Sequence, residues 1–210
     1  MTTDIEEGLP QGWGVVPLSQ LCELRSAGTP VTVLKEAEPG AVPLVRPADL
    51  RERRIVHSGT AFVSGIQAQG LDRGRIRAGD ILVTRTGTVG RVALVTDAES
   101  GWFHNTHVLC LRPSDAASAP YLAGFLAGPG SVAWMNGHAA GSAIRSITVG
   151  ALAGLPVVLP PPGEQRRIGA VLGALDEKIR VHEEIARTTG LLRESLAGLL
   201  MSGKVSVPPK

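Results

Sequence analysis

A long periodic segment that follows three consecutive prolines, Pro160–Pro162, constrains this chain more than any other feature. From residue 168 to residue 200, a seam of mainly apolar positions recurs at alternating steps of four and three residues. That spacing lines side chains up along one stripe of an α-helix. A helix from Glu164 to Met201 would be about 57 Å long. One small domain cannot cover such a stripe, so the pattern predicts a coiled-coil helix that packs against a partner helix. The seam positions are Ile168, Leu172, Leu175, Ile179, His182, Ala186, Thr189, Arg193, Leu196 and Leu200.

The seam has interruptions that leave a second interpretation open. His182, Thr189 and Arg193 are polar residues near its centre, and Gly190 and Gly198 weaken the helix. The alternative is a terminal helix that folds back on its own domain. We prefer an interface helix. The residues expected to form the interface are Ile168, Leu172, Leu175, Ile179, Leu192 and Leu196.

Composition indicates a soluble folded chain rather than a membrane protein or a disulfide-rich one. The 210 residues are 43% hydrophobic and 19% charged, with a formal net charge of +2. Every apolar run is shorter than a membrane span, which needs about 18 residues. Residues Met1–Leu9 lack the basic start of a signal peptide, and the two cysteines suit a reducing compartment. These features predict a cytoplasmic protein.

Turn residues and short apolar runs predict an α+β fold, in which a β-rich globular domain precedes the long helix. An additional short helix is expected from Ser19 to Arg25, because Ser19 suits an N-cap. The expected strands are 42–45, 61–63, 81–84, 91–95, 106–111 and 157–159, and the expected short helices are 120–127, 131–136 and 149–155. The predicted organisation is a loose tail at 1–9, a globular domain at 10–161, the helix at 162–202 and a flexible tail at 203–210.

Basic side chains gather in one part of the sequence. Between Arg46 and Arg91 lie nine arginines and four acids, so this segment carries +5 and the remainder carries −3. Arginine forms bidentate hydrogen bonds with phosphates and with guanine edges. The clustering therefore points toward nucleic-acid binding. A solvated arginine face and a GC-rich genome, which favours arginine codons, are the alternatives.

We find no catalytic constellation in the sequence. His104 and His107 are expected near opposite faces of their segment, without a third metal ligand. The glycine-rich stretch Thr86–Gly90 lacks the lysine of a phosphate-binding loop and lies between two expected strands, so a tight turn explains it better. Cys110 belongs to an apolar strand and is expected to be buried. A binding protein is favoured, and a nucleotide-binding enzyme that uses Thr86–Gly90 is the weaker alternative.

Several segments, taken in order, resemble one protein family. They are Leu9–Trp13 with Val16–Leu18 and Leu21–Glu23, then Arg77–Gly90, then Asn105–Pro113, and finally Leu155–Gln165 continued by Ile168, Leu172 and Leu175–Ile179. The last of them joins an apolar strand, a proline pair and a Glu-Gln helix start. Together they are similar to the target recognition domain of type I restriction–modification specificity subunits. Each segment occurs once, whereas a full specificity subunit resembles two such units in tandem, so the chain resembles half a subunit.

The resemblance implies sequence-specific recognition of double-stranded DNA, with no catalysis and no cofactor or metal on this chain. Each recognition domain would read one half of a split site, and the helix would act as a spacer. The implied partners are a DNA adenine methyltransferase subunit, which would hold S-adenosylmethionine, and a restriction or translocase subunit, which would use ATP and Mg²⁺. A homodimer, or a pair with a second half-subunit, would form through the long helix; a symmetric pair would read a palindromic site. A stand-alone recognition subunit for another phage-defence methyltransferase is the alternative.

The expected DNA contacts are arginines and small polar residues in loops. Arg85 and Arg91 flank the glycine turn, and Arg145 lies in a flexible loop at 141–146. An ordinary solvated side chain is the alternative for each of them. The full set is Arg46, Arg51, Arg53, Arg54, Arg85, Thr86, Arg91, Ser142 and Arg145.

Overall fold

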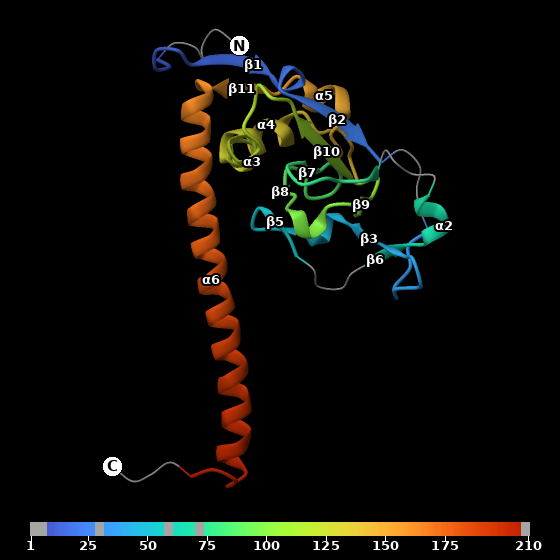
Figure 1. The fold of residues 1–210 in the computed structure, drawn as a ribbon, viewed down its shortest axis with the longest axis vertical. Helices are drawn as coiled ribbons and strands as arrows, with labels where there is room; N and C mark the ends of the chain where they lie inside the picture. The colour runs from blue at the N-terminus through green and yellow to red at the C-terminus, as the bar shows by residue number, and fades with distance from the viewer. Residues whose placement is uncertain (1–7, 28–31, 57–60, 70–73, 207–210) are drawn as a thin grey trace. The chain divides into compact units, whose positions relative to one another are not determined.

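Figure 1 shows the fold of the chain as a computed structural model, which describes residues 8–27, 32–56, 61–69 and 74–206. The chain divides into two compact units, Met1–Leu172 and Gly173–Lys210, and each is described by itself. All the strands of the described residues belong to the first unit, and most of one long helix belongs to the second. The predicted α+β class, a β-rich domain followed by a long C-terminal helix, is confirmed.

The centre of the first unit is a four-stranded antiparallel sheet in the order β2-β10-β7-β8. Side chains alternate across a strand, so Ile81 and Val83 join one apolar cluster while Leu82 joins another on the opposite face. Because both faces are covered, all four residues of β7 are buried. The strands are β2 (Cys22–Ser26), β7 (Ile81–Thr84), β8 (Val92–Leu94) and β10 (Val108–Pro113).

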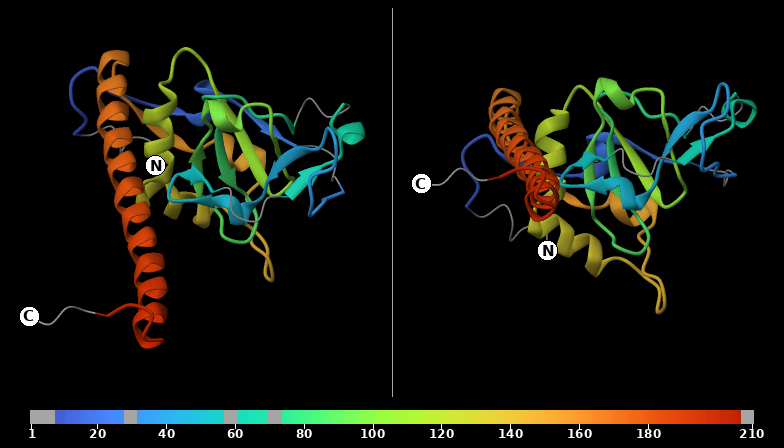
Figure 2. Two further views of the ribbon diagram at one scale, coloured as in Figure 1. Left: turned by 60° about the horizontal axis from the view of Figure 1, so that its bottom comes forward. Right: turned by 90° about the horizontal axis from the view of Figure 1, so that it is seen from below.

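Three short helices cover the face of the sheet that Ile81 and Val83 line (Figure 2). Each of them contributes a side chain with no exposed surface to this cluster, such as Leu122, Met135 and Leu152. The helices are α3 (Ala119–Ala127), α4 (Pro129–Gly137) and α5 (Val149–Ala153).

Smaller strands cover the opposite face. A three-stranded sheet in the order β6-β3-β9 joins an antiparallel pair to a parallel one, and β4 pairs with β5 as a hairpin. Val45, Leu50 and Ile55 from this layer pack with the Leu82 side of the central sheet. The elements are β3 (Val42–Val45), β4 (Leu50–Arg51), β5 (Arg54–Ile55), β6 (Ala61–Val63), β9 (Phe103–His104), the helix α2 (Gly65–Ala68), and the 3-10 helices η2 (Pro47–Asp49) and η4 (Asp97–Glu99).

The start of the long helix is fixed to the sheet domain by hydrogen bonds. The strand β1 (Gly14–Pro17) pairs antiparallel with β11 (Pro156–Leu159), which leads into the helix α6 (Pro162–Met201). The indole nitrogen of Trp13 donates to a carboxylate oxygen of Glu164 at 3.0 Å. The buried amide of Gln165 accepts from the Ser118 backbone N–H at 2.9 Å and donates to the Pro160 carbonyl at 2.9 Å. These contacts explain the Glu-Gln pair at the helix start.

Two glycines let α3 approach the first turns of α6. A Cβ atom on Gly169 would lie 3.0 Å from the Tyr121 backbone nitrogen, and one on Gly124 would lie 2.5 Å from the Leu172 side chain. The expected interface residue Leu172 therefore packs within the first unit, and Ile168 is half-buried. The compact unit accordingly extends to Leu172, past the end of the predicted globular domain at residue 161.

The structure corrects the local prediction for residues 19–25. A 3-10 helix, η1 (Leu18–Gln20), is followed after one residue by β2, so the expected helix from Ser19 to Arg25 is wrong. Ladder hydrogen bonds with β10 pair Cys22 with Pro113 and Ser26 with Leu109. These long-range bonds outweigh the local signal, because an N-cap contributes only about 1 kcal/mol.

Residues 173–201 of α6 form a continuous helix that passes through Gly190 and Gly198. Its apolar side chains remain exposed, with Leu175 at 51% and Leu192 at 62%. Ion pairs one turn apart, Glu177 with Arg180 and Glu184 with Arg187, support the helix on its polar side. Among the described residues, no helix combines the length and the apolar character that crossing a membrane requires.

Candidate nucleic-acid interface

The β7–β8 turn, residues 85–91, lies at the centre of the candidate interface. Gly87 and Gly90 adopt left-handed backbone conformations, with φ of +76° and +91°. The buried hydroxyl of Thr84 accepts from the Arg91 backbone N–H at 2.9 Å and donates to the Thr88 carbonyl. The structure thus confirms a tight turn between two strands, and the turn is fixed from within by one buried side chain.

A second loop, residues 140–146, is hydrogen-bonded to this turn; we call it the tip loop. The Gly87 backbone N–H donates to the Arg145 carbonyl at 3.0 Å, and the hydroxyl groups of Thr86 and Ser146 lie 3.3 Å apart. The Arg85 carbonyl accepts from the Ile147 N–H at 2.9 Å. Three of the expected DNA contacts, Arg85, Thr86 and Arg145, are therefore neighbours in space although the two loops are far apart in sequence.

Gly90 and Arg91 of the turn also border a surface hollow of about 530 Å³, which we call the arginine hollow. Arg51, Arg53 and Arg91, all of them expected DNA contacts, line it together with Glu52. The carboxylate of Glu52 lies 2.9 Å from the guanidinium of Arg54, so the acid in this lining is paired with a base. The remaining lining residues are Leu50, Gly90, Val92 and Ala127.

The hairpin that carries Arg53 holds an uncommon backbone conformation. β4 and β5 are joined by Glu52 and Arg53, whose φ angles are 52° and 60°. A two-residue hairpin turn with both residues at positive φ normally contains Asn or Gly. A residue with a Cβ atom costs free energy there, and such residues concentrate at functional sites. The sequence does not signal this hairpin, because its turn lacks the usual glycine or asparagine.

Two of the expected contacts, Arg46 and Arg54, form ion pairs with neighbouring acids. Arg46 donates through Nε and Nη2 to both carboxylate oxygens of Asp49, each at 3.1 Å, and this hydrogen bonding raises the pKa of the Arg46 guanidinium. Arg54 donates through Nη2 to a carboxylate oxygen of Glu52 at 2.9 Å. Neither residue lines the arginine hollow. Ser142 is exposed on the tip loop. Contact with DNA remains a prediction for every residue of the set.

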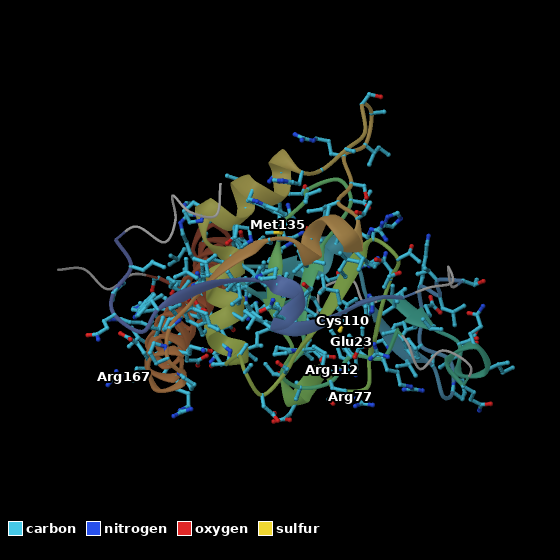
Figure 3. The ribbon with its side chains drawn as sticks, turned by 90° about the horizontal axis from the view of Figure 1, so that it is seen from above. Glu23, Arg77, Cys110, Arg112, Met135 and Arg167 are labelled. Carbon is cyan, nitrogen blue, oxygen red and sulfur yellow. The ribbon has the colours of Figure 1, made fainter. Side chains whose placement is uncertain are left out.

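A buried charge cluster at the opposite end of β7 was not anticipated from the sequence. Asp80, only 2% exposed, accepts a bidentate pair of hydrogen bonds from Arg112 at 2.8 and 2.7 Å. The Arg77 backbone N–H and the Cys110 thiol also donate to it. Arg77, Cys110 and Arg112, which these bonds join to Asp80, are labelled in Figure 3. Cys110 is buried in β10, as expected, and burial raises the pKa of its thiol.

The two histidines have different environments. His104 is buried, its Nδ1 lies 2.9 Å from the Val108 carbonyl, and burial lowers its pKa. Its Nε2 has no hydrogen-bond partner among the described residues. His107 is exposed. Within the described part of the chain, no group of three or more histidine, cysteine or acidic side chains is arranged to hold a metal ion.

Solved structures share this architecture. The S subunit of a type I restriction–modification system from M. genitalium superposes with a TM-score of 0.65 at 18% identity, covering 90% of this chain and 46% of that one. The HsdS subunit from Thermoanaerobacter tengcongensis superposes with a TM-score of 0.59 at 23% identity, covering 96% and 53%. At these identities the likeness defines the fold: a sheet domain joined to a long helix.

The family follows from the sequence comparison. The model of the type I restriction modification DNA specificity domain matches residues 10–188, and the chain belongs to this family. The type I restriction enzyme MjaIX specificity subunit of Methanocaldococcus jannaschii is 24% identical over 179 residues, covering 84% of this chain and 40% of that subunit. The chain thus spans about two fifths of the length of its curated relatives. The family resemblance inferred from the sequence motifs is confirmed.

Proposed function

We propose that this chain recognises double-stranded DNA for a type I restriction–modification complex, and that the β7–β8 turn, the tip loop and the arginine hollow form the DNA-binding surface. The observation that carries the proposal is the convergence of Arg51, Arg53 and Arg91 on one hollow. Phosphate contacts by arginine supply affinity, and arginine forks that reach base edges supply specificity. The β4–β5 hairpin and the β7–β8 turn supply these arginines, and the tip loop is hydrogen-bonded to the same turn, so the three segments would together form one DNA-binding surface.

The proposed partners follow from the family. The chain would direct a DNA adenine methyltransferase subunit, and in a cleaving system a restriction or translocase subunit, to its site. S-adenosylmethionine, ATP and Mg²⁺ would bind to those partners. The specificity-domain match to residues 10–188 supports this assignment, because it extends from the recognition domain well into α6.

The apolar seam of α6 supports pairing with a second helix. Side chains such as Leu175, Ile179 and Leu196 are about half exposed in the single chain. Burying each of them contributes about 1.5–3 kcal/mol, so a seam of this length sustains an interface. We propose that the second helix comes from another copy of this chain, which would place two recognition domains on a palindromic split site.

Genome-wide methylation mapping tests the DNA-recognition proposal. Deleting the gene should remove adenine methylation from one bipartite motif, and the wild-type gene should restore it. The triple substitution of Arg51, Arg53 and Arg91 by alanine should restore little methylation, whereas Arg77→Ala, at the far end of β7, should restore it fully. Methylation that is unchanged by the deletion would refute the proposal. Co-purification with a methyltransferase of another type would assign the chain to a different complex.

A further inference from the structure

We propose that Ile144, at the end of the tip loop, is a specificity-determining residue that contacts the 5-methyl group of a thymine in the major groove. The inference rests on the proposed DNA-binding function and adds to it a named base feature. It adds an apolar contact to a surface whose other proposed contacts are mainly arginines.

The tip loop presents an apolar side chain to solvent. All five residues from Gly141 to Arg145 are exposed, and Ile144 is 65% exposed. Figure 2 shows the loop, in yellow-orange, projecting from the sheet domain. Ala143 and Ile144 stand next to each other there, so the end of the loop is apolar while its base adjoins the β7–β8 turn.

The loop is held in a defined conformation by its own backbone. Ala140 and Ser146 exchange two backbone hydrogen bonds, of 3.0 and 2.8 Å. Gly141 has a φ of +115°, and a Cβ atom there would lie 2.3 Å from the Ile144 carbonyl oxygen. Only glycine therefore permits this bend, which lies in the loop that the Ala140–Ser146 bridge closes and that carries Ile144.

Arg145 fixes the loop to the domain. Its Nη2 donates to the carbonyls of Ala139, at 3.1 Å, and of Asn136 at the end of α4. Its own carbonyl accepts from Gly87 of the β7–β8 turn. Arg145 is in this respect a positioning residue, and Ile144 is presented without a large loss of conformational freedom on binding.

The groups that duplex DNA exposes determine what Ile144 would contact. The base edges are read mainly in the major groove, and the thymine 5-methyl is the distinctive apolar group among them. An isoleucine side chain forms a van der Waals contact with that methyl group, and the hydroxyl of Ser142 on the same loop is available for a neighbouring base. The hydrogen bonds to the basic β7–β8 turn favour DNA over a protein surface, because they join the tip to the arginines that would contact the phosphate backbone.

Selection from randomised duplexes tests the assignment. The full chain, with its methyltransferase subunit, is used to select from one library made with thymine and from a second in which uracil replaces thymine. Uracil pairs as thymine does but lacks the methyl group. Wild-type protein should show a thymine preference at one position in the first library, and that preference should fall about three- to fivefold in the second. Ile144→Ala should show the reduced preference in both libraries.

Controls separate this proposal from the proposed function. Ile66→Ala removes an isoleucine of α2 that is 87% exposed and should select as the wild type does. Ile144→Val should retain most of the preference, and thermal unfolding should be unchanged in all variants.

A wild-type consensus that Ile144→Ala leaves intact in the thymine library would overturn the assignment. If Ile144→Ala abolished bending of the DNA but kept the base preference, the assignment would also be overturned, because Ile144 would then act as a wedge inserted between base pairs. Failure of the wild type to select any consensus would refute the proposed function itself.

Discussion

Arg53 combines a costly backbone conformation with a place in the arginine hollow. Its φ of 60° and that of Glu52, 52°, belong to the left-handed region, where residues other than glycine and asparagine are uncommon. The turn is held because the Arg53 carbonyl accepts from the Leu94 N–H at 3.2 Å and β4–β5 packs on β8. We interpret the strain as the consequence of placing a guanidinium where a glycine would be more stable.

Replacing Arg53 by glycine should therefore raise the stability of the fold while weakening DNA binding. Arg53→Gly relieves the strain and should stabilise the fold by about 1 kcal/mol, which corresponds to a rise in Tm of about 2–4 °C. The same change should weaken DNA binding at least about fivefold, since a good arginine contact is worth about 1–3 kcal/mol. Thermal unfolding and DNA titration at fixed salt measure the two effects. Arg77→Ala is the control, and equal DNA affinity of Arg53→Gly and wild type would remove Arg53 from the interface.

His104 should make stability depend on pH. Burial lowers its pKa below the ordinary value of 6.5, so below that pH the unfolded chain binds a proton that the folded chain does not. The free energy of unfolding should fall as the pH decreases from 6.5, by at most about 1.4 kcal/mol per pH unit from this group. Urea unfolding at pH 7.5 and at lower pH values measures the slope. His104→Asn keeps a donor toward Val108 and should flatten the slope; an unchanged slope would assign it to other groups.

Among the elements, the start of α6 depends on one buried amide. Gln165 bonds to the partly buried Ser118 N–H and to the buried Pro160 carbonyl, and a smaller side chain leaves both groups without this partner. Gln165→Ala should lower the free energy of unfolding by about 1–3 kcal/mol. Glu164→Ala, which removes the bond to Trp13 at a less buried position, should have a smaller effect. Thermal unfolding compares them, and equal losses in the two variants would contradict this ranking.

Elements with a continuous apolar run were predictable from the sequence. The structure contains the predicted strands at 42–45, 61–63 and 81–84 as β3, β6 and β7, and the predicted long helix as α6. A strand buried on both faces has a continuous apolar run in the sequence, and a helix with one apolar stripe has a repeat of three and four residues. β2 was missed because its stability comes from pairing with β10, far along the chain. The β4–β5 hairpin was missed because its turn residues, Glu52 and Arg53, have positive φ angles, where glycine or asparagine is usual.

At the scale of the whole molecule, the candidate site combines segments that no local pattern joins. Arg51 and Arg53 come from one hairpin, Arg91 from the β7–β8 turn and Arg145 from the tip loop. The sequence indicated these residue types but not their grouping, nor that Arg46 and Arg54 are engaged with Asp49 and Glu52. Pairing preferences of this kind depend on tertiary geometry, which composition and spacing do not contain.

The apolar seam of α6 predicts that two copies of the chain pair through this helix. Leu175→Asp combined with Ile179→Asp places charges in the proposed helix pair and should convert a dimer into monomers at micromolar concentration. Ala174→Asp combined with Val181→Asp adds the same charge to the same helix outside the seam and should leave the dimer intact. Sedimentation equilibrium measures the mass, and circular dichroism verifies that helix content is retained.

Three outcomes of that experiment differ in meaning. Dissociation by the seam pair alone would establish the seam as the interface, because the control equalises charge and helix propensity. A dimer that survives Leu175→Asp with Ile179→Asp would place the interface elsewhere and leave the seam to internal packing. A wild-type chain that sediments as a monomer would refute self-pairing, and the exposed side chains would then require a different helix. Two copies joined through α6 would carry two arginine hollows, so the dissociated variant should also lose the steep salt dependence that phosphate contacts on both half-sites provide.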